Sequence, residues 1–231
     1  MVKLGVVIPA AGQGKRMGVS INKQFIPLRG RPLLAHTLAL FEQSELISEI
    51  VIVASREDRQ SIGELVESEG LQKVSSIVVG GKERQESVFA GLKALSPLIQ
   101  RVAVHDGARP LLTCQELNRF FTEAEEFRAA IMAIPVKDTI KKVDSQGKVL
   151  ETPPRDTLRA VQTPQVFDRH LLEEAHQRAV ESGYLATDDA ALVEWQGHPV
   201  QTLMGSLENI KITTPEDLDL AESILAKRES K

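Results

Sequence analysis

The sequence contains a single cysteine, Cys114, which excludes an intrachain disulfide and a metal site built from several cysteines. No apolar run approaches the roughly 20 residues of a membrane-spanning helix, and the apolar start of the chain is too short for a signal peptide. With a net charge of −4, the chain also lacks the positive excess of a surface that coats nucleic acid. We therefore expect a cytoplasmic protein that binds neither nucleic acid nor a membrane, with a buried, inert Cys114.

At 231 residues the chain can bury a full core, and we expect a single α/β domain over residues 1–231. Short apolar runs, typical of strands, alternate with segments whose apolar residues recur every three or four positions, as in helices. The expected strands are 4–8, 50–54, 76–79, 102–105 and 130–134, and the expected helices are 32–43, 59–68, 84–95, 115–127, 168–182 and one that begins at Thr214. This alternation predicts a mostly parallel, Rossmann-like sheet with helices on both faces and ligands at the carboxyl ends of the strands.

A β-hairpin arm is expected at about residues 136–155. Residues 136–143 and 148–152 flank a polar turn that ends in Gly147. The pair is too polar for a core, and an isolated hairpin is marginally stable in water, so packing against a second subunit would stabilise it. A solvated hairpin on a monomer is the alternative.

The first expected strand ends in a glycine turn flanked by cations, Pro9-Ala10-Ala11-Gly12-Gln13-Gly14-Lys15-Arg16-Met17-Gly18, and Lys23 follows. Backbone N–H groups and positive charge together are typical of a polyphosphate site. The dinucleotide fingerprint fails because Met17 occupies its third glycine position, and a Walker loop fails because Arg16 stands where Ser or Thr is needed. A purely structural turn remains possible, although such a turn does not require the cations.

Two further strand-end loops are expected to meet this turn in one crevice. Gly80-Gly81 leads into a helix with Ser87 one turn further on, and its backbone could bind the edge of a base. Asp106 and Arg109, in His105-Asp106-Gly107-Ala108-Arg109-Pro110, could bind a metal ion or a hydroxyl group and a phosphate, respectively. His105 itself is expected to pack in the core.

Three other polar groups have two possible interpretations each. Lys211 is either a surface lysine or a phosphate ligand. Asp188-Asp189 could suggest a metal pair, but helix N-capping is favoured. Arg84 either belongs to the loop's ligand site or covers a solvated first turn.

Together, six segments in order along nearly the whole chain resemble the 2-C-methyl-D-erythritol 4-phosphate cytidylyltransferase family. The segments are Pro9–Met17 with Lys23, Gly80-Gly81 with Glu83-Arg84 and Ser87, His105–Pro110, Pro135–Thr139, Gln162–Gln165 and Asn209–Lys211. The resemblance implies a nucleotidyltransferase fold and a cytoplasmic homodimer formed through the arm. It also implies transfer of CMP from CTP to methylerythritol phosphate, with release of pyrophosphate, in non-mevalonate isoprenoid synthesis.

The resemblance further implies roles for individual residues. The catalytic cations would be Arg16, Lys23 and Lys211. The CTP ligands would be Ala10, Ala11, Gly12, Gly14, Gly81, Lys82 and Ser87. The acceptor ligands would be Asp106, Arg109 and Thr163, with Thr139 and Arg155 from a partner's arm. Mg²⁺ would be held mainly by the CTP phosphates rather than by a side-chain cage, with Asp106 as the candidate side-chain ligand. Two positions depart from the family's common forms, since Lys82 replaces an acidic residue and Gly107 an alanine.

Three alternatives stay open from the sequence. A cytidylyltransferase for another sugar or polyol phosphate, such as ribitol 5-phosphate, shares the segments around Lys23 and Gln162–Gln165. A dinucleotide-dependent oxidoreductase would bind NAD tightly. A non-catalytic nucleotide sensor would bind CTP without releasing pyrophosphate.

Overall fold

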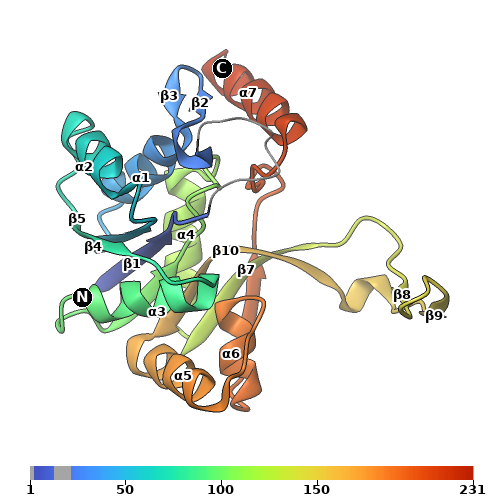
Figure 1. The fold of residues 1–231 in the computed structure, drawn as a ribbon. Coiled ribbons are helices and arrows are strands. Elements are labelled where there is room, and N and C mark those ends of the chain that lie inside the picture. Colours follow the sequence, from blue (N-terminus) through green and yellow to red (C-terminus); the bar gives the residue numbers. More distant parts are fainter. Residues whose placement is uncertain (1–2, 13–21, 231) are drawn as a thin grey trace.

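The computed structural model describes residues 3–12 and 22–230. Its central sheet has the strand order β11-β7-β10-β6-β1-β4-β5 (Figure 1). These strands are β1 (Leu4–Pro9), β4 (Ile47–Ala54), β5 (Val74–Val79), β6 (Arg101–Val104), β7 (Ala129–Pro135), β10 (Arg159–Asp168) and β11 (Gln201–Met204). Every neighbouring pair is parallel except the two that β10 makes with β6 and β7. The mostly parallel sheet is thereby confirmed.

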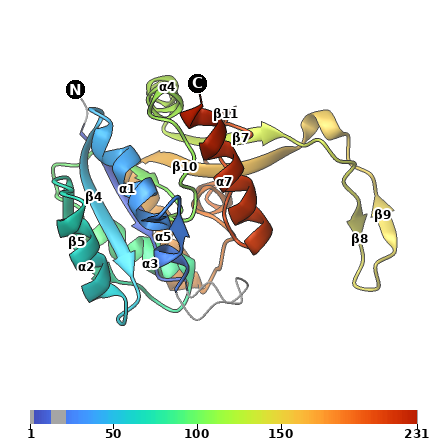
Figure 2. The ribbon, with the colours of Figure 1, turned by 90° about the horizontal axis from the view of Figure 1, so that it is seen from above.

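Helices cover both faces of this sheet (Figures 1 and 2). They are α1 (Leu33–Gln43), α2 (Arg59–Ser68), α3 (Arg84–Ala94), α4 (Cys114–Ala124), α5 (Arg169–Ser182), α6 (Asp189–Trp195) and α7 (Pro215–Glu229). None of those in the described ranges has the length and apolarity that a bilayer crossing requires. Cys114 begins α4 and is partly exposed, so the expectation of a buried thiol was wrong.

The alternation of side chains along the central strands divides the core into two layers. On β1, Val6 and Ile8 pack with α1, α2 and α4, whereas Val7 packs with α3, α5 and α6. Successive strand residues point to opposite faces, so a continuous apolar run can bury both faces. A third cluster joins α7 to the short hairpin of β2 (Pro27–Leu28) and β3 (Arg31–Pro32).

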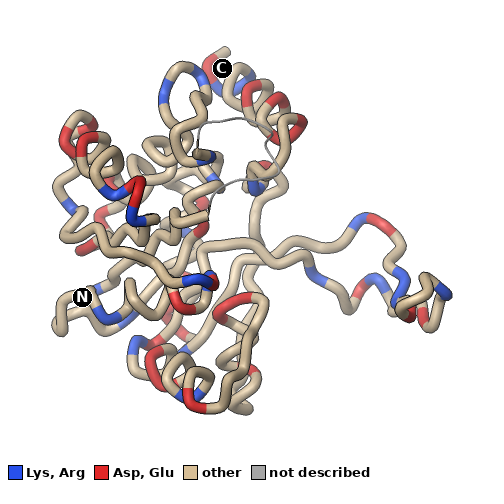
Figure 3. Tube along the Cα trace, in the orientation of Figure 1, with Lys and Arg blue, Asp and Glu red and all other residues tan. Residues whose placement is uncertain are grey.

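The segment between β7 and β10 leaves the sheet as a projecting arm (Figure 2). Its hairpin, β8 (Lys142–Val143) and β9 (Val149–Glu151), is shorter than the sequence suggested. Figure 3 shows both basic and acidic residues along the arm. Apolar side chains are exposed there too, among them Val149 and Leu150 at 53% and 59%.

Helix α3 approaches the sheet closely through Gly91. A Cβ at this position would lie 2.5 Å from Val7 Cγ1 and 2.8 Å from Val53 Cγ2. Since buried valines cannot move aside without disturbing β1 and β4, any larger residue would displace the helix.

We expect Gly91→Ala to lower the free energy of unfolding by about 1–3 kcal/mol, because overpacking outweighs the gain in helix propensity. Urea denaturation measures the change. Gly63→Ala on α2 is the matched control: the nearest atom to its Cβ, Ile77 Cδ1, lies 3.9 Å away. There the substitution should be neutral or stabilise by up to about 1 kcal/mol. Equal effects at both glycines would contradict the close approach of α3.

Candidate active site

A cleft of about 250 Å³ opens at the carboxyl ends of β1, β5 and β6. It is lined by residues from the glycine turn, the Lys23 segment, the loop before α3, the loop after β6 and the Lys211 segment. Those residues are Pro9, Ala10, Ala11, Gly12, Lys23, Gln24, Leu33, Gly81, Lys82, Glu83, Arg84, Ser87, Asp106, Gly107, Ala108 and Lys211. The expected meeting of three strand-end loops in one crevice is confirmed.

The glycine turn begins directly at the end of β1. The Ala10 N–H donates to the carbonyl of Val53 on β4 at 2.7 Å, which continues the sheet by one residue. Ala11 and Gly12 then lie on the cleft wall. Gly14 and Arg16, expected to bind the triphosphate, lie outside the described residues.

The loop before α3 depends on two glycines. A Cβ on Gly80 would lie 2.6 Å from Ser87 Oγ, and one on Gly81 would overlap Glu86. The absence of side chains lets the Gly81 N–H donate to Ser87 Oγ at 3.2 Å, while the Lys82 N–H donates to Glu86 at 2.7 Å. Lys82, which stands where the resemblance led us to expect an acidic residue, has an exposed side chain and holds the loop through its backbone N–H.

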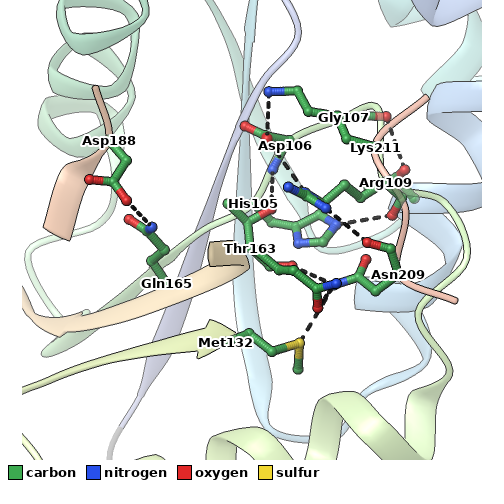
Figure 4. Close-up of polar contacts among 12 residues, drawn as sticks. His105, Asp106, Gly107, Arg109, Met132, Thr163, Gln165, Asp188, Asn209 and Lys211 are labelled. Atoms are coloured by element: carbon green, nitrogen blue, oxygen red, sulfur yellow. Dashed lines mark hydrogen bonds and ion pairs between the residues drawn. The ribbon is translucent and has the colours of Figure 1, made fainter. Parts of the chain in front are cut away.

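A buried carboxylate, Asp106, gathers three cations at the cleft. Figure 4 shows two of them, Arg109 and Lys211. Its oxygens lie 2.9 Å from Lys211 Nζ, 3.4 Å from Arg84 Nε and 3.6 Å from Arg109 Nε. Burial alone would raise the pKa of Asp106, but Arg84, Lys211 and Arg109 outweigh it and hold that pKa well below its ordinary value. Asp106 is therefore ionised at neutral pH, and Lys211, 41% exposed, can reach an anion in the cleft.

Arg84 links this carboxylate to a second one, Asp189, at the start of α6. Its Nη1 donates to Asp189 Oδ2 at 2.7 Å, and His176 Nε2 lies 3.3 Å from the other oxygen. Burial alone would lower the pKa of Arg84, but Asp189 and Asp106 raise it above its ordinary value. The interpretation of Arg84 as a solvated first-turn residue was wrong, and the sequence offered no signal that it would bridge two carboxylates.

The favoured N-capping interpretation of Asp188-Asp189 holds for only one of the two. Asp188 is the cap and accepts from the Ala191 N–H at 2.9 Å, and Gln165 donates to its other oxygen (Figure 4). Asp189, 1% exposed, turns inward to Arg84 instead. Among residues 3–12 and 22–230, no group of three or more His, Cys, Asp or Glu side chains could hold a metal ion.

Strand β10 brings Thr163 to Asp106 through an irregularity in its pairing. The register with β7 shifts between Val161 and Gln165, so the intervening residues leave the regular ladder. As a result, Thr163 Oγ1 accepts the Asp106 N–H at 3.0 Å (Figure 4). Asn209 binds the Thr163 carbonyl at 2.9 Å, and its own carbonyl accepts from Arg109 at 2.8 Å. Asp106, Arg109 and Thr163, the acceptor ligands that the resemblance implied, thus lie together, although only Asp106 of the three is among the residues that line the cleft.

Two expected acceptor ligands lie elsewhere within one chain. Thr139 and Arg155 are on the arm, exposed, and Arg155 donates to the carbonyl of Lys137 at 2.9 Å. Neither is among the residues that line the cleft.

A mostly parallel α/β sheet with a glycine turn and clustered cations at its strand ends is suited to binding the phosphates of a nucleotide, and the family comparison places the chain among the nucleotidyltransferases. The comparisons with known proteins identify the particular family. Its model, described as IspD, 2-C-methyl-D-erythritol 4-phosphate cytidylyltransferase, matches residues 4–227. The chain belongs to this family, as its resemblance indicated.

Individual relatives match this chain over nearly its full length. The 2-C-methyl-D-erythritol 4-phosphate cytidylyltransferase of Halalkalibacterium halodurans is 54% identical over 228 residues, which cover 99% of each chain. The crystal structure of 4-diphosphocytidyl-2C-methyl-D-erythritol synthase from Anaerococcus prevotii superposes with a TM-score of 0.87 at 33% identity, covering 97% of this chain and 96% of that one. The crystal structure of the cytidylyltransferase from Thermus thermophilus gives 0.77 at 35% identity, covering 98% and 100%.

His105, beside Asp106, packs in the core as expected and provides a test of the site's burial. It is fully buried, and its ring lies edge-on to that of Phe41, with the ring centroids 5.0 Å apart. Its Nε2 donates to the Arg109 carbonyl at 3.1 Å. Burial lowers the pKa of His105 to about 4, from an ordinary value of 6.5.

Stability should therefore fall as the pH drops from about 6.5 to about 4. In this window the unfolded chain binds a proton at His105 and the native chain does not, so the free energy of unfolding decreases by about 3 kcal/mol. Urea denaturation across this range measures the slope, and His105→Gln, which keeps a donor but does not titrate there, is the comparison. An unchanged slope in the variant would contradict the buried neutral imidazole.

Proposed function

We propose that this chain transfers CMP from CTP to 2-C-methyl-D-erythritol 4-phosphate and releases pyrophosphate, forming 4-diphosphocytidyl-2-C-methyl-D-erythritol for isoprenoid synthesis. The observation that carries the proposal is the cluster of Lys211, Arg84 and Arg109 around Asp106, in a cleft that the glycine turn and Lys23 also line. Membership of the cytidylyltransferase family assigns this chemistry and disfavours ribitol 5-phosphate as the acceptor.

The cations would offset the repulsion between the two anionic substrates, which is the main obstacle to the reaction. A phosphate monoester is already an anionic nucleophile and needs no base, but it must approach a triphosphate that is also negatively charged. At about 4 Å and an effective dielectric near 20, each pair of opposite unit charges gains roughly 4 kcal/mol. Lys23, Lys211 and Arg16 would stabilise the charge that develops at the reacting phosphate and the leaving pyrophosphate.

The acceptor would be oriented by the same cluster. The ionised Asp106 would accept hydrogen bonds from the acceptor's hydroxyl groups, and Arg109 and Thr163 would hold the site's shape through Asn209. The loop of Gly81, Lys82 and Ser87 would bind cytosine and ribose, in exchange for the hydrogen bonds that it makes within itself.

Magnesium would be bound mainly by the phosphates of CTP. Asp106 suits the ion as one further ligand, because it is an ionised carboxylate on the cleft wall and Mg²⁺ prefers oxygen. The ion would neutralise part of the phosphate charge.

The arm would complete the site of a second subunit in a homodimer. A hairpin with strands of two and three residues has little stability of its own, and its exposed apolar residues suit a protein surface. Thr139 and Arg155 would then reach the acceptor across the interface.

The function is tested by pyrophosphate release with CTP and Mg²⁺, comparing methylerythritol phosphate, ribitol 5-phosphate and no acceptor. Release with methylerythritol phosphate alone is expected. Release with ribitol 5-phosphate alone would move the acceptor assignment, and no release with either, despite CTP binding, would contradict the proposal in favour of a sensor.

Mixing two inactive variants tests the shared site. Lys23→Ala and Arg155→Ala should each lower kcat about 10²-fold, since each removes a positively charged side chain that would bind the reacting phosphates. In a mixed dimer one site keeps both residues, so random exchange of subunits should restore about a quarter of the wild-type activity. No recovery, with exchange verified by native mass spectrometry, would place Arg155 in the site of its own subunit.

A further inference from the structure

Asp58 is the residue directly before α2, where an aspartate normally caps the helix, but its carboxylate does not cap α2. It follows β4, directly precedes Arg59–Ser68 and makes no side-chain hydrogen bond to the helix N-terminus. The residue is nevertheless 7% exposed. A buried carboxylate requires strong partners, so its partners elsewhere define its role.

Those partners are the two residues on either side of Lys23. Asn22 Nδ2 donates to Asp58 Oδ1 at 2.6 Å, and Gln24 Nε2 donates to Oδ2 at 2.5 Å. Ser55 Oγ donates to Oδ2 as well, at 2.8 Å, and accepts the Asp58 N–H at 3.0 Å. The carboxylate thus joins the end of β4 to the Lys23 segment, more than 30 residues away in sequence.

The Lys23 segment has a separate attachment on its far side. Lys23–Phe25 form a single 3-10 turn, after which Ile26 packs into the third core cluster and its carbonyl accepts the Leu33 N–H at 2.9 Å. This fixes the turn downstream of Lys23. The Asp58 carboxylate fixes it upstream, through Asn22, and at its centre, through Gln24. Lys23, between these two residues, is one of the residues that line the cleft.

An aspartate is chemically suited to this task. An ionised carboxylate only accepts hydrogen bonds, so both oxygens can serve the three donors at once. Bonds to a charged acceptor are also roughly twice as strong as neutral ones. Asparagine of the same shape would turn an NH₂ group toward one of the donors.

We propose that Asp58 is a positioning residue for the transfer reaction: by holding Asn22 and Gln24, it sets the place of the Lys23 ammonium against the phosphates of CTP. The inference deepens the proposed function and rests on it. Asp58 does not line the cleft and acts only through Lys23.

The test is the kcat of Asp58→Asn in pyrophosphate release. A small displacement of a catalytic group can cost up to about 10²-fold, so we expect a loss of about 10-fold or more, with the KM for the acceptor unchanged. Glu64→Gln is the matched control, because it removes an exposed charge from α2 that only Gln60 contacts in the described hydrogen bonds. It should keep wild-type kcat, and an Asp58→Asn enzyme as active as this control would overturn the proposal.

A double-mutant cycle separates positioning from a general loss of stability. In a Lys23→Ala background, Asp58→Asn should lower kcat by less than about 2-fold, because the group that it positions is gone. The same loss in both backgrounds would mean that Asp58 acts independently of Lys23 and would overturn the proposal. Asn22→Ala removes one tether without touching the buried carboxylate, and it should show the same dependence on Lys23 even if Asp58→Asn fails to fold.

A binding measurement separates this inference from the function on which it rests. If the wild-type enzyme releases no pyrophosphate, the proposed function fails, and titration calorimetry with pyrophosphate alone still tests the tether. Affinity should fall in Asp58→Asn or Asn22→Ala and not in Glu64→Gln. Equal affinity in all of these proteins would overturn the role of Asp58.

Discussion

The site depends on one buried carboxylate that holds cations of different origin at one point. Arg84 comes from α3, Arg109 from the loop after β6 and Lys211 from the segment before α7, and all three face Asp106. Without this carboxylate, the three cations in a partly desolvated cleft would lose the negative group that all of them share and that offsets their mutual repulsion. The net positive charge that remains after Asp106 and Asp189 are counted is what an anionic substrate meets.

The fold brings these residues to one point through an order of strands and helices that the sequence predicts well. Apolar runs such as Val6–Ile8 and Val51–Ala54 are buried on both faces, and their length and spacing predict parallel strands between helices. The glycine turn, the Gly80-Gly81 loop and Asp106 follow three such strands directly. Their place in one cleft therefore follows from strand order, before any side chain is considered.

What the sequence did not reveal depends on contacts between distant segments. Strand β10 was missed because its middle, Gln162–Gln165, is polar and contains a proline, and its ladder is irregular at that point. Arg84 and Asp58 have no local signature, since each is defined by partners such as Asp189 and Gln24, which lie far away along the chain. Such pairings are tertiary facts, and periodicity carries no information about them.

Strand β10 links the position of the arm to the geometry of the site. The same strand delivers Thr163 to Asp106 and, at its other end, continues from the arm that carries Arg155. Strand β7, which pairs with it, leads into the arm from the opposite side. A shift of the β7–β10 register would move Thr163 and the base of the arm together. The register that builds the cleft therefore also sets the direction in which the arm projects.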